Sequence, residues 1–284
     1  MPSQTGVSFA FSLESEMWKI NHERCGLLFG PAAAILQIAH PRIAQGVAEH
    51  SNFESDSVGR LRRTLASTNR IAFGTAKQAE ETRERLRGVH SQVRGKAATG
   101  VEGPANYSAF EPDLLLWVLA TLVLAALHGY ELVHGKLPTN RKEVFYADMR
   151  RFGSYFGLGE DVGPTDFLAF EGYYHDMLSN DLLGSHPLCS KLAQSIVYPR
   201  DSIQTRALGH GLSFLPIETL PAKLLPKLGL RSSSFSRSQM RLLKTLLPSL
   251  YPKLPRSLRL YPEALERLKF ESSTPGFRTS HPNQ

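Results

Sequence analysis

The hydrophobic positions of this 284-residue chain recur mainly at helical spacing, and no stretch shows the strict alternation of a half-buried strand. This pattern predicts helices over residues 32–39, 42–50, 60–73, 76–93, 114–127, 141–156, 164–178, 186–197 and 201–210. No internal repeat and no βαβ pattern is present. We therefore expect an all-α fold with a single multi-helix domain.

Residues that start or stop helices support these boundaries. His40-Pro41 separates the first two helices, because a residue before proline is pushed out of the α region. Thr75 suits the N-cap of the 76–93 helix, and Asp113 suits the N-cap of the helix that begins at 114. Residues 95–107 contain three glycines and a proline, so we expect a long loop there.

The stretch 114–127 is the most apolar part of the chain. The uncharged window between Asp113 and Glu131 is 17 residues long, whereas a helix needs about 20 residues to cross a bilayer core. This length favours a buried core helix over a membrane span.

The two ends of the chain differ from its middle. Residues 1–20 are polar and mixed, and we expect a loose entry segment there. An N-terminal extension over 1–24 is expected to precede a domain over 25–265. From residue 216 onward, prolines separate short Leu-rich, basic pieces, which suit either helical hairpins on the core or an interfacial surface for lipid. Residues 266–284 are expected to be a disordered tail.

Composition narrows the function classes. The formal net charge of +7 suggests anionic partners, but the charge is not gathered in a tail and no nucleic-acid-binding motif is present, so no nucleic-acid partner is expected. Two cysteines do not support a disulfide framework. Glu14, Glu16 and Lys19 interrupt any apolar leader, so no cleavable signal is predicted and the location is expected to be cytoplasmic or membrane-associated.

His90 is the first candidate for chemistry. Arg83, Arg87, His90 and Arg94 are spaced by four, three and four residues, which places them on one face of the predicted helix. A neutral imidazole can bind iron or zinc, and arginines suit carboxylates such as haem propionates. From the spacing alone, the alternative of a solvated, salt-bridged helix stays open.

Two other groups of residues have a functional and a structural interpretation. Arg60, Arg63 and Thr64 could line a pocket, with a guanidinium over an anion or oxygen and a hydroxyl as proton donor, or they could be a basic helix start. His40, Glu49 and His50 invite a metal site, but a proline break separates them and their spacing matches no compact ligand set. No GxSxG, Walker A or GxGxxG motif is present.

Several motifs, in a fixed order, resemble one family. They are GPAAAILQIAHP (30–41), GVAEHS (46–51), RLRRT (60–64), FG (73–74), RGVH (87–90), GPANY (103–107), DLLLWVLATL (113–122) and LPRSLR (254–259). In this order they resemble the MpaB and latex-clearing-protein (rubber oxygenase) catalytic domain family, over roughly residues 25–265.

The resemblance implies an all-α protein that binds haem b (iron) and uses dioxygen to cleave C=C bonds of isoprenoid chains. It places the iron ligand at His90 with Arg87 as its partner, and it places Arg60 and Thr64 on the pocket side. Arg63 stands where rubber oxygenases have a lysine that can cap the iron, and a guanidinium is a poor iron ligand, so that role is not expected. We expect Arg63 and Trp117 to lie beside the cofactor.

One departure from the family pattern concerns the reaction. The family's Trp-Val-His is here Trp117-Val118-Leu119, so the contribution of that histidine is absent. The expected function is a haem-dependent oxygenase acting with O2 on a hydrophobic terpenoid- or polyketide-like substrate of secondary metabolism, through C=C cleavage. The alternatives are another haem oxidation (hydroxylation, desaturation or oxidative cyclisation) and a non-catalytic haem- or lipid-binding protein at a membrane surface.

Overall fold

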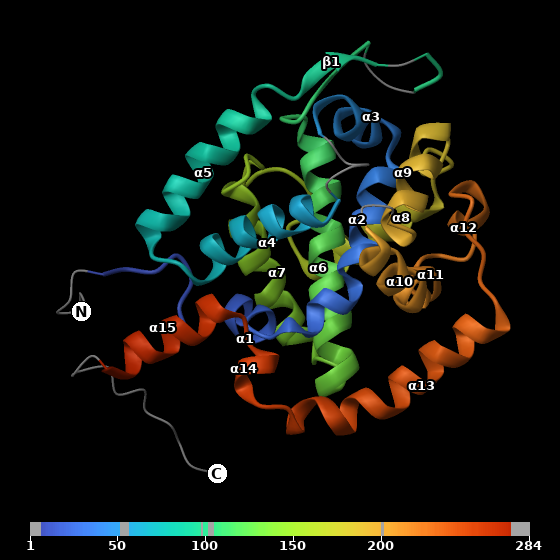
Figure 1. The fold of residues 1–284 in the computed structure, drawn as a ribbon. Helices are drawn as coiled ribbons and strands as arrows, with labels where there is room; N and C mark the ends of the chain where they lie inside the picture. The colour runs from blue at the N-terminus through green and yellow to red at the C-terminus, as the bar shows by residue number, and fades with distance from the viewer. Residues whose placement is uncertain (1–6, 52–56, 98, 102–104, 200–201, 274–284) are drawn as a thin grey trace.

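A computed structural model describes residues 7–51, 57–97, 99–101, 105–199 and 202–273, which are helical apart from loops and one pair of short strands (Figure 1). The first half contains α1 (Glu16–Asn21), the 3₁₀ helix η1 (Arg24–Phe29), α2 (Gly30–Ala39), α3 (Pro41–His50), α4 (Ser57–Phe73), α5 (Ala76–His90), β1 (Arg94–Lys96), β2 (Asn106–Ser108) and α6 (Pro112–His134). The second half contains α7 (Thr139–Ser154), α8 (Phe167–Ser179), α9 (Pro187–Val197), α10 (Ile203–Leu212), α11 (Phe214–Thr219), α12 (Leu224–Lys227), α13 (Ser234–Leu250), the 3₁₀ helix η2 (Tyr251–Lys253), α14 (Arg256–Arg259) and α15 (Pro262–Ser273). The predicted all-α class is confirmed.

Helix α6 is the centre of the fold. It runs through the middle of the molecule and packs against η1, α2, α7 and α13 (Figure 1). Its side chains at Leu119, Val123 and Leu127 are buried, as expected for a core helix. By length and composition, α6 is the one described helix able to cross a membrane, but most of its apolar window is covered by protein. The bent stretch from Arg24 to His50 passes the same test only when its two parts are taken together.

Of the two predicted N-caps, the one at the start of α5 is confirmed and the one at the start of α6 is wrong. The Thr75 hydroxyl accepts a hydrogen bond from the Gln78 amide at 3.2 Å, and the Gln78 side chain accepts one from the Thr75 amide at 2.9 Å. Asp113 does not cap α6, because the helix already begins at Pro112 with Glu111 at its N-cap. The Glu111 carboxylate instead accepts hydrogen bonds from Arg42 and from the Ser108 amide.

The predicted loop over 95–107 contains a small antiparallel sheet, so the expectation of no strand is wrong there. Arg94 pairs with Ser108 and Gly95 pairs with Tyr107. A Cβ added at Gly95 would lie 2.8 Å from the Tyr107 ring, so the aromatic side chain requires glycine on the facing strand. Since α5 ends at His90, Arg94 belongs to β1 and does not share the helical face predicted for it.

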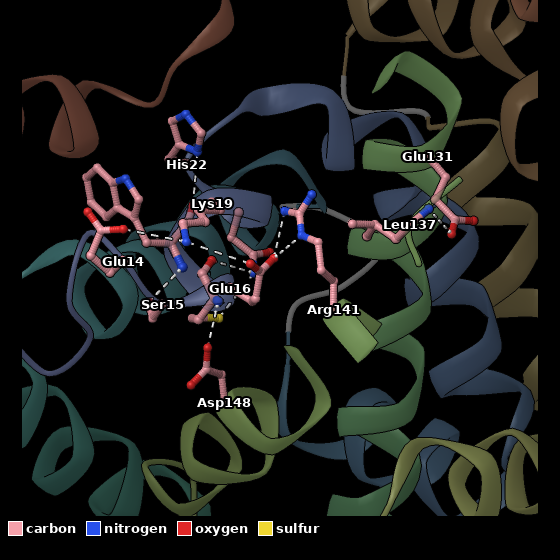
Figure 2. Close-up of polar contacts among 12 residues, drawn as sticks. Glu14, Ser15, Glu16, Lys19, His22, Glu131, Leu137, Arg141 and Asp148 are labelled. Carbon is pink, nitrogen blue, oxygen red and sulfur yellow. Dashed lines mark hydrogen bonds and ion pairs between the residues drawn. The ribbon is translucent and has the colours of Figure 1, made fainter. Parts of the chain in front are cut away.

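The N-terminal segment is part of the core from residue 10 onward, so the expectation of a loose entry segment is wrong there. Phe11, Trp18 and other apolar residues of this segment are buried with the main cluster. Figure 2 shows the hydrogen bonds between α1 and α7. Arg141 donates to Glu16 at 2.7 Å, and the Met17 amide donates to Asp148 at 2.9 Å. The domain boundary predicted at residue 25 stays a prediction.

The predicted tail over 266–284 is helical up to Ser273, and residues 274–284 lie outside the described part. Arg267 and Glu271 of α15 are buried and joined by a 2.8 Å hydrogen bond. The Arg267 guanidinium lies 3.9 Å from the centre of the Phe9 ring and 4.7 Å from that of Trp18. These charged residues therefore pack against the N-terminal segment instead of facing water.

Candidate functional site

Helices α4 and α5 form the frame of the candidate site. They pack together and are joined by the short break at Gly74-Thr75, so the chain reverses direction between them (Figure 1). The beginning of α4 and the end of α5 therefore lie toward the same end of the hairpin. This arrangement brings Arg60, Arg63 and Thr64 to the same end of the hairpin as Arg87 and His90.

His90 is the last residue of α5 and is partly exposed. Its Nδ1 atom is buried and has no hydrogen-bond partner among the described residues. Its ring meets Phe110 edge to face, with 5.9 Å between the ring centres. Burial lowers the pKa of His90 below its ordinary value, and the nearby backbone of Phe156 opposes this in part. The lowered pKa favours the neutral form of the imidazole, which is the form that binds metals.

Arg60 is half-buried at the start of α4, and its Nη1 atom donates to the Ser51 hydroxyl at 2.8 Å. Burial and the charge of Arg63 lower its pKa, yet a guanidinium stays charged at neutral pH. Thr64 lies one turn further along the same face and is exposed, as is Arg63. Arg87 is also exposed, three residues before His90. This end of the hairpin thus carries a partly exposed imidazole together with exposed and half-buried cations.

Trp117 occupies a structural position. Its side chain is fully buried, its Nε1 atom donates to the Leu36 carbonyl at 2.8 Å, and its ring stacks on Tyr174 with 5.8 Å between centres. These contacts join α6 to α2 and α8. The indole N–H is already used within the core, and the expected contact with a cofactor stays a prediction.

A polar network beside the site was missed by the sequence analysis. The Tyr107 hydroxyl donates to the Glu49 carboxylate, and His50 Nε2 lies 3.1 Å from the same hydroxyl. Gln45 donates to the other Glu49 oxygen at 2.8 Å. Burial and the Glu49 contact raise the pKa of Tyr107. Glu49 and His50 therefore tie α3 to β2, which no local spacing could reveal because Tyr107 is 57 residues or more away.

The alternative metal site is not formed. His40 is buried, with its Nδ1 atom lacking a partner, while Glu49 and His50 are engaged with Tyr107. Across the described residues, no group of three or more His, Cys, Asp or Glu side chains is placed to hold a metal ion. Cys25 and Cys189 are buried and unbonded, in agreement with the absence of a disulfide framework.

His40 makes the stability of the protein depend on pH. Burial, reinforced by the charge of Arg42, lowers its pKa to about 4. An unfolded chain binds a proton at His40 below about pH 6.5, whereas the folded chain does not, so stability is full above 6.5 and falls as the pH drops toward 4. We expect this residue to contribute up to about 3 kcal/mol of that loss. Urea unfolding of wild type and His40→Gln between pH 4 and 7 tests this, and equal pH slopes for the two proteins would contradict it.

The chain is similar in sequence to known proteins. A sequence model of the family described as "ER-bound oxygenase mpaB/B'/Rubber oxygenase, catalytic domain" matches residues 18–248. Uncharacterized protein Mb2261 of Mycobacterium bovis and uncharacterized protein Rv2237 of Mycobacterium tuberculosis are each 31% identical over 154 residues. The match covers 52% of this chain and 58% of the length of each relative.

No solved structure matches the chain significantly. The family match, in contrast, extends over most of the chain and contains both helices of the hairpin and the whole of α6. The chain therefore belongs to the mpaB and rubber oxygenase catalytic-domain family, a family of oxygenases.

Proposed function

We propose that this protein is a haem b-dependent oxygenase that acts with O2 on a lipophilic, terpenoid- or polyketide-like substrate and cleaves a C=C bond. Family membership supports an oxygenase in general. The observation that carries the haem proposal is His90, whose buried Nδ1 atom lacks a hydrogen-bond partner among the described residues. An unsatisfied buried nitrogen costs about 1–3 kcal/mol, which a bond to a ligand would remove.

The residues around His90 fit a haem. A porphyrin supplies its own nitrogen ligands, so His90 alone would be enough to hold the iron and no cluster of protein ligands would be needed. The ring of Phe110 provides an apolar contact next to His90. Arg87 and Arg63, both exposed at the same end of the hairpin, suit the two propionates. When bound, the haem would supply the iron that reacts with dioxygen.

Arg60 and Thr64 would act on the oxygen and the substrate. The Arg60 guanidinium is held by Ser51 and is partly shielded from water, so its charge acts in a medium of reduced dielectric. It would stabilise negative charge that develops on oxygen. The Thr64 hydroxyl, one turn away, would donate or hold a proton at its Oγ1 atom.

Two alternatives remain within this proposal. Leu119, which is buried, replaces the histidine of the family's Trp-Val-His, and this favours a different haem oxidation such as hydroxylation, desaturation or oxidative cyclisation as the second candidate. A non-catalytic haem- or lipid-binding role is the third. Peripheral membrane association is part of the proposal.

Oxygen consumption with alkene substrates tests the proposal. The haem-loaded protein is incubated with isoprenoid and polyketide-like alkenes, with an oxygen electrode and mass spectrometry as readouts. Cleavage adds two oxygen atoms and leaves carbonyl ends, hydroxylation adds one oxygen, and desaturation removes two hydrogens. Uptake of haem without oxygen consumption on any alkene would favour the non-catalytic role.

Arg60→Gln should lower kcat by about 100-fold, the usual effect of removing one positioned donor. The matched control is Arg62→Gln, because Arg62 is exposed on the same helix and is two residues from Arg60. Haem content and thermal unfolding of both variants show whether the site is still loaded and folded. Equal loss of kcat in the two variants would contradict the role given to Arg60.

A further inference from the structure

Helix α13 carries an exposed apolar stripe. Phe235, Leu242, Leu246 and Leu250 are spaced by seven, four and four residues, so they lie on one face of the helix. Their exposed fractions are 74%, 59%, 45% and 54%. Leu254 and Leu258, which follow α13, are exposed as well. We call these six residues the α13 stripe.

The core contacts of α13 come from a face next to the stripe, about a quarter turn away around the helix. The helix packs on the core through Met240, Leu243 and Leu247, which contact α11, Leu28 and the cluster around Cys25. Figure 1 shows α13 along the outer edge of the molecule, with no other helix outside it. Its 17 residues give a stripe about 25 Å long. The side chains of the stripe therefore stay between 40% and 74% exposed in the described part of the chain.

The surrounding chain is strongly basic. Between Leu220 and Tyr261 there are nine Lys and Arg residues and no Asp or Glu, although the whole chain has 33 basic and 26 acidic residues. The remaining residues thus carry 24 basic and 26 acidic side chains, so this segment accounts for all of the net positive charge. The nine residues are Lys223, Lys227, Arg231, Arg237, Arg241, Lys244, Lys253, Arg256 and Arg259.

Some of these charges border the stripe. Arg241 donates to Ser238 at 3.1 Å, which brings its guanidinium toward the stripe side of the helix. Lys253 and Arg256 are exposed, and both lie within two residues of Leu254 in sequence. Arg237 and Lys244 lie on the other side of α13 and would contribute only a longer-range attraction.

The charge of this segment and the composition of α13 indicate what binds to the α13 stripe. A second copy of the chain is disfavoured, because two segments with nine basic and no acidic residues would repel each other. A convex helix with Leu and Phe on one face and Lys and Arg beside them has the composition of helices that lie in a membrane interface. We propose that the α13 stripe docks on an anionic lipid bilayer, with its apolar side chains at the headgroup boundary and Arg241, Lys253 and Arg256 on lipid phosphates or carboxylates.

Vesicle flotation of the full chain tests this proposal and does not depend on haem or turnover. The protein is expected to float with phosphatidylcholine vesicles that contain about one third phosphatidylserine, and to stay at the bottom with phosphatidylcholine alone. Each surface charge changes the partition coefficient about fivefold, so Arg241→Gln with Lys253→Gln and Arg256→Gln should lower it about 100-fold. The charge-matched control changes three exposed lysines elsewhere to Gln: Lys77, Lys136 and Lys269.

A second pair of variants tests the apolar stripe. Leu242→Ser with Leu246→Ser should lower the partition coefficient at least tenfold, whereas Val144→Ser with Leu168→Ser, which changes exposed residues on α7 and α8, should leave it unchanged. All four side chains are exposed, so thermal unfolding should stay the same. No flotation of the wild type, or equal flotation of the stripe variant and its control, would overturn the proposal. Binding to an acidic protein without binding to vesicles would also overturn it.

Discussion

Trp117→Ala should lower the free energy of unfolding by about 3–5 kcal/mol, the usual range for truncating a buried tryptophan. The side chain is fully buried on the central helix, so truncation would leave a cavity where α6 meets α2 and α8. It would also leave the Leu36 carbonyl without its indole donor and Tyr174 without its stacked ring. Urea unfolding measures the loss.

Two controls separate packing from cofactor contact. Trp117→Phe keeps an aromatic ring and loses the hydrogen bond to Leu36, so its cost should be smaller than that of Trp117→Ala. Phe235→Ala removes an exposed ring and should change stability by less than about 0.5 kcal/mol. A stable Trp117→Phe protein that no longer binds haem would support the predicted contact with the cofactor. A Trp117→Ala protein as stable as wild type would contradict the packing role.

Local patterns were sufficient where a helix is long or clearly delimited. The break at Pro41, the N-cap at Thr75 and the apolar run of α6 all act through residues close in sequence, and the structure agrees with these features. The helix starts at Pro112 instead of after Asp113, and proline suits the first helical position because its missing N–H would be unpaired there. This local signal was overlooked in favour of the cap expected at Asp113.

The errors at the two ends of the chain share one cause. Helix α1 has six residues, too few for a periodic pattern, and α15 carries charges that resemble a solvated tail. In the structure, the Arg267 guanidinium lies over the rings of Phe9 and Trp18, so α15 and the N-terminal segment cover part of each other's surface. Such contacts join residues more than 200 positions apart and have no local signature.

The order of the motifs predicts that Arg60, Thr64, Arg87 and His90 share one site, and this assignment stays a prediction. The α4–α5 hairpin carries all four residues toward one of its ends. The Tyr107 contacts with Glu49 and His50 could not be predicted, because they depend on a strand pair with only three residues in each strand. Arg94 was assigned to the wrong element for the same reason.

His90→Ala should lose most of its haem, because the proposed ligand is a single imidazole. Even the removal of groups that only support a metal ligand costs about 10–100-fold in affinity, so removal of the ligand should cost at least as much. The variant should still fold, since His90 is partly exposed and its Nδ1 atom makes no hydrogen bond within the described residues. His210→Ala, on exposed α10, is the matched control.

The absorption spectrum of the purified protein, as isolated and after reduction with dithionite, is the most direct test of this proposal. We expect a Soret band in wild type and His210→Ala that changes on reduction, and a lost or shifted band in His90→Ala. A colourless wild-type protein that takes up no added haem would contradict the proposed function. A Soret band unchanged in His90→Ala would contradict the assignment of His90 as the ligand.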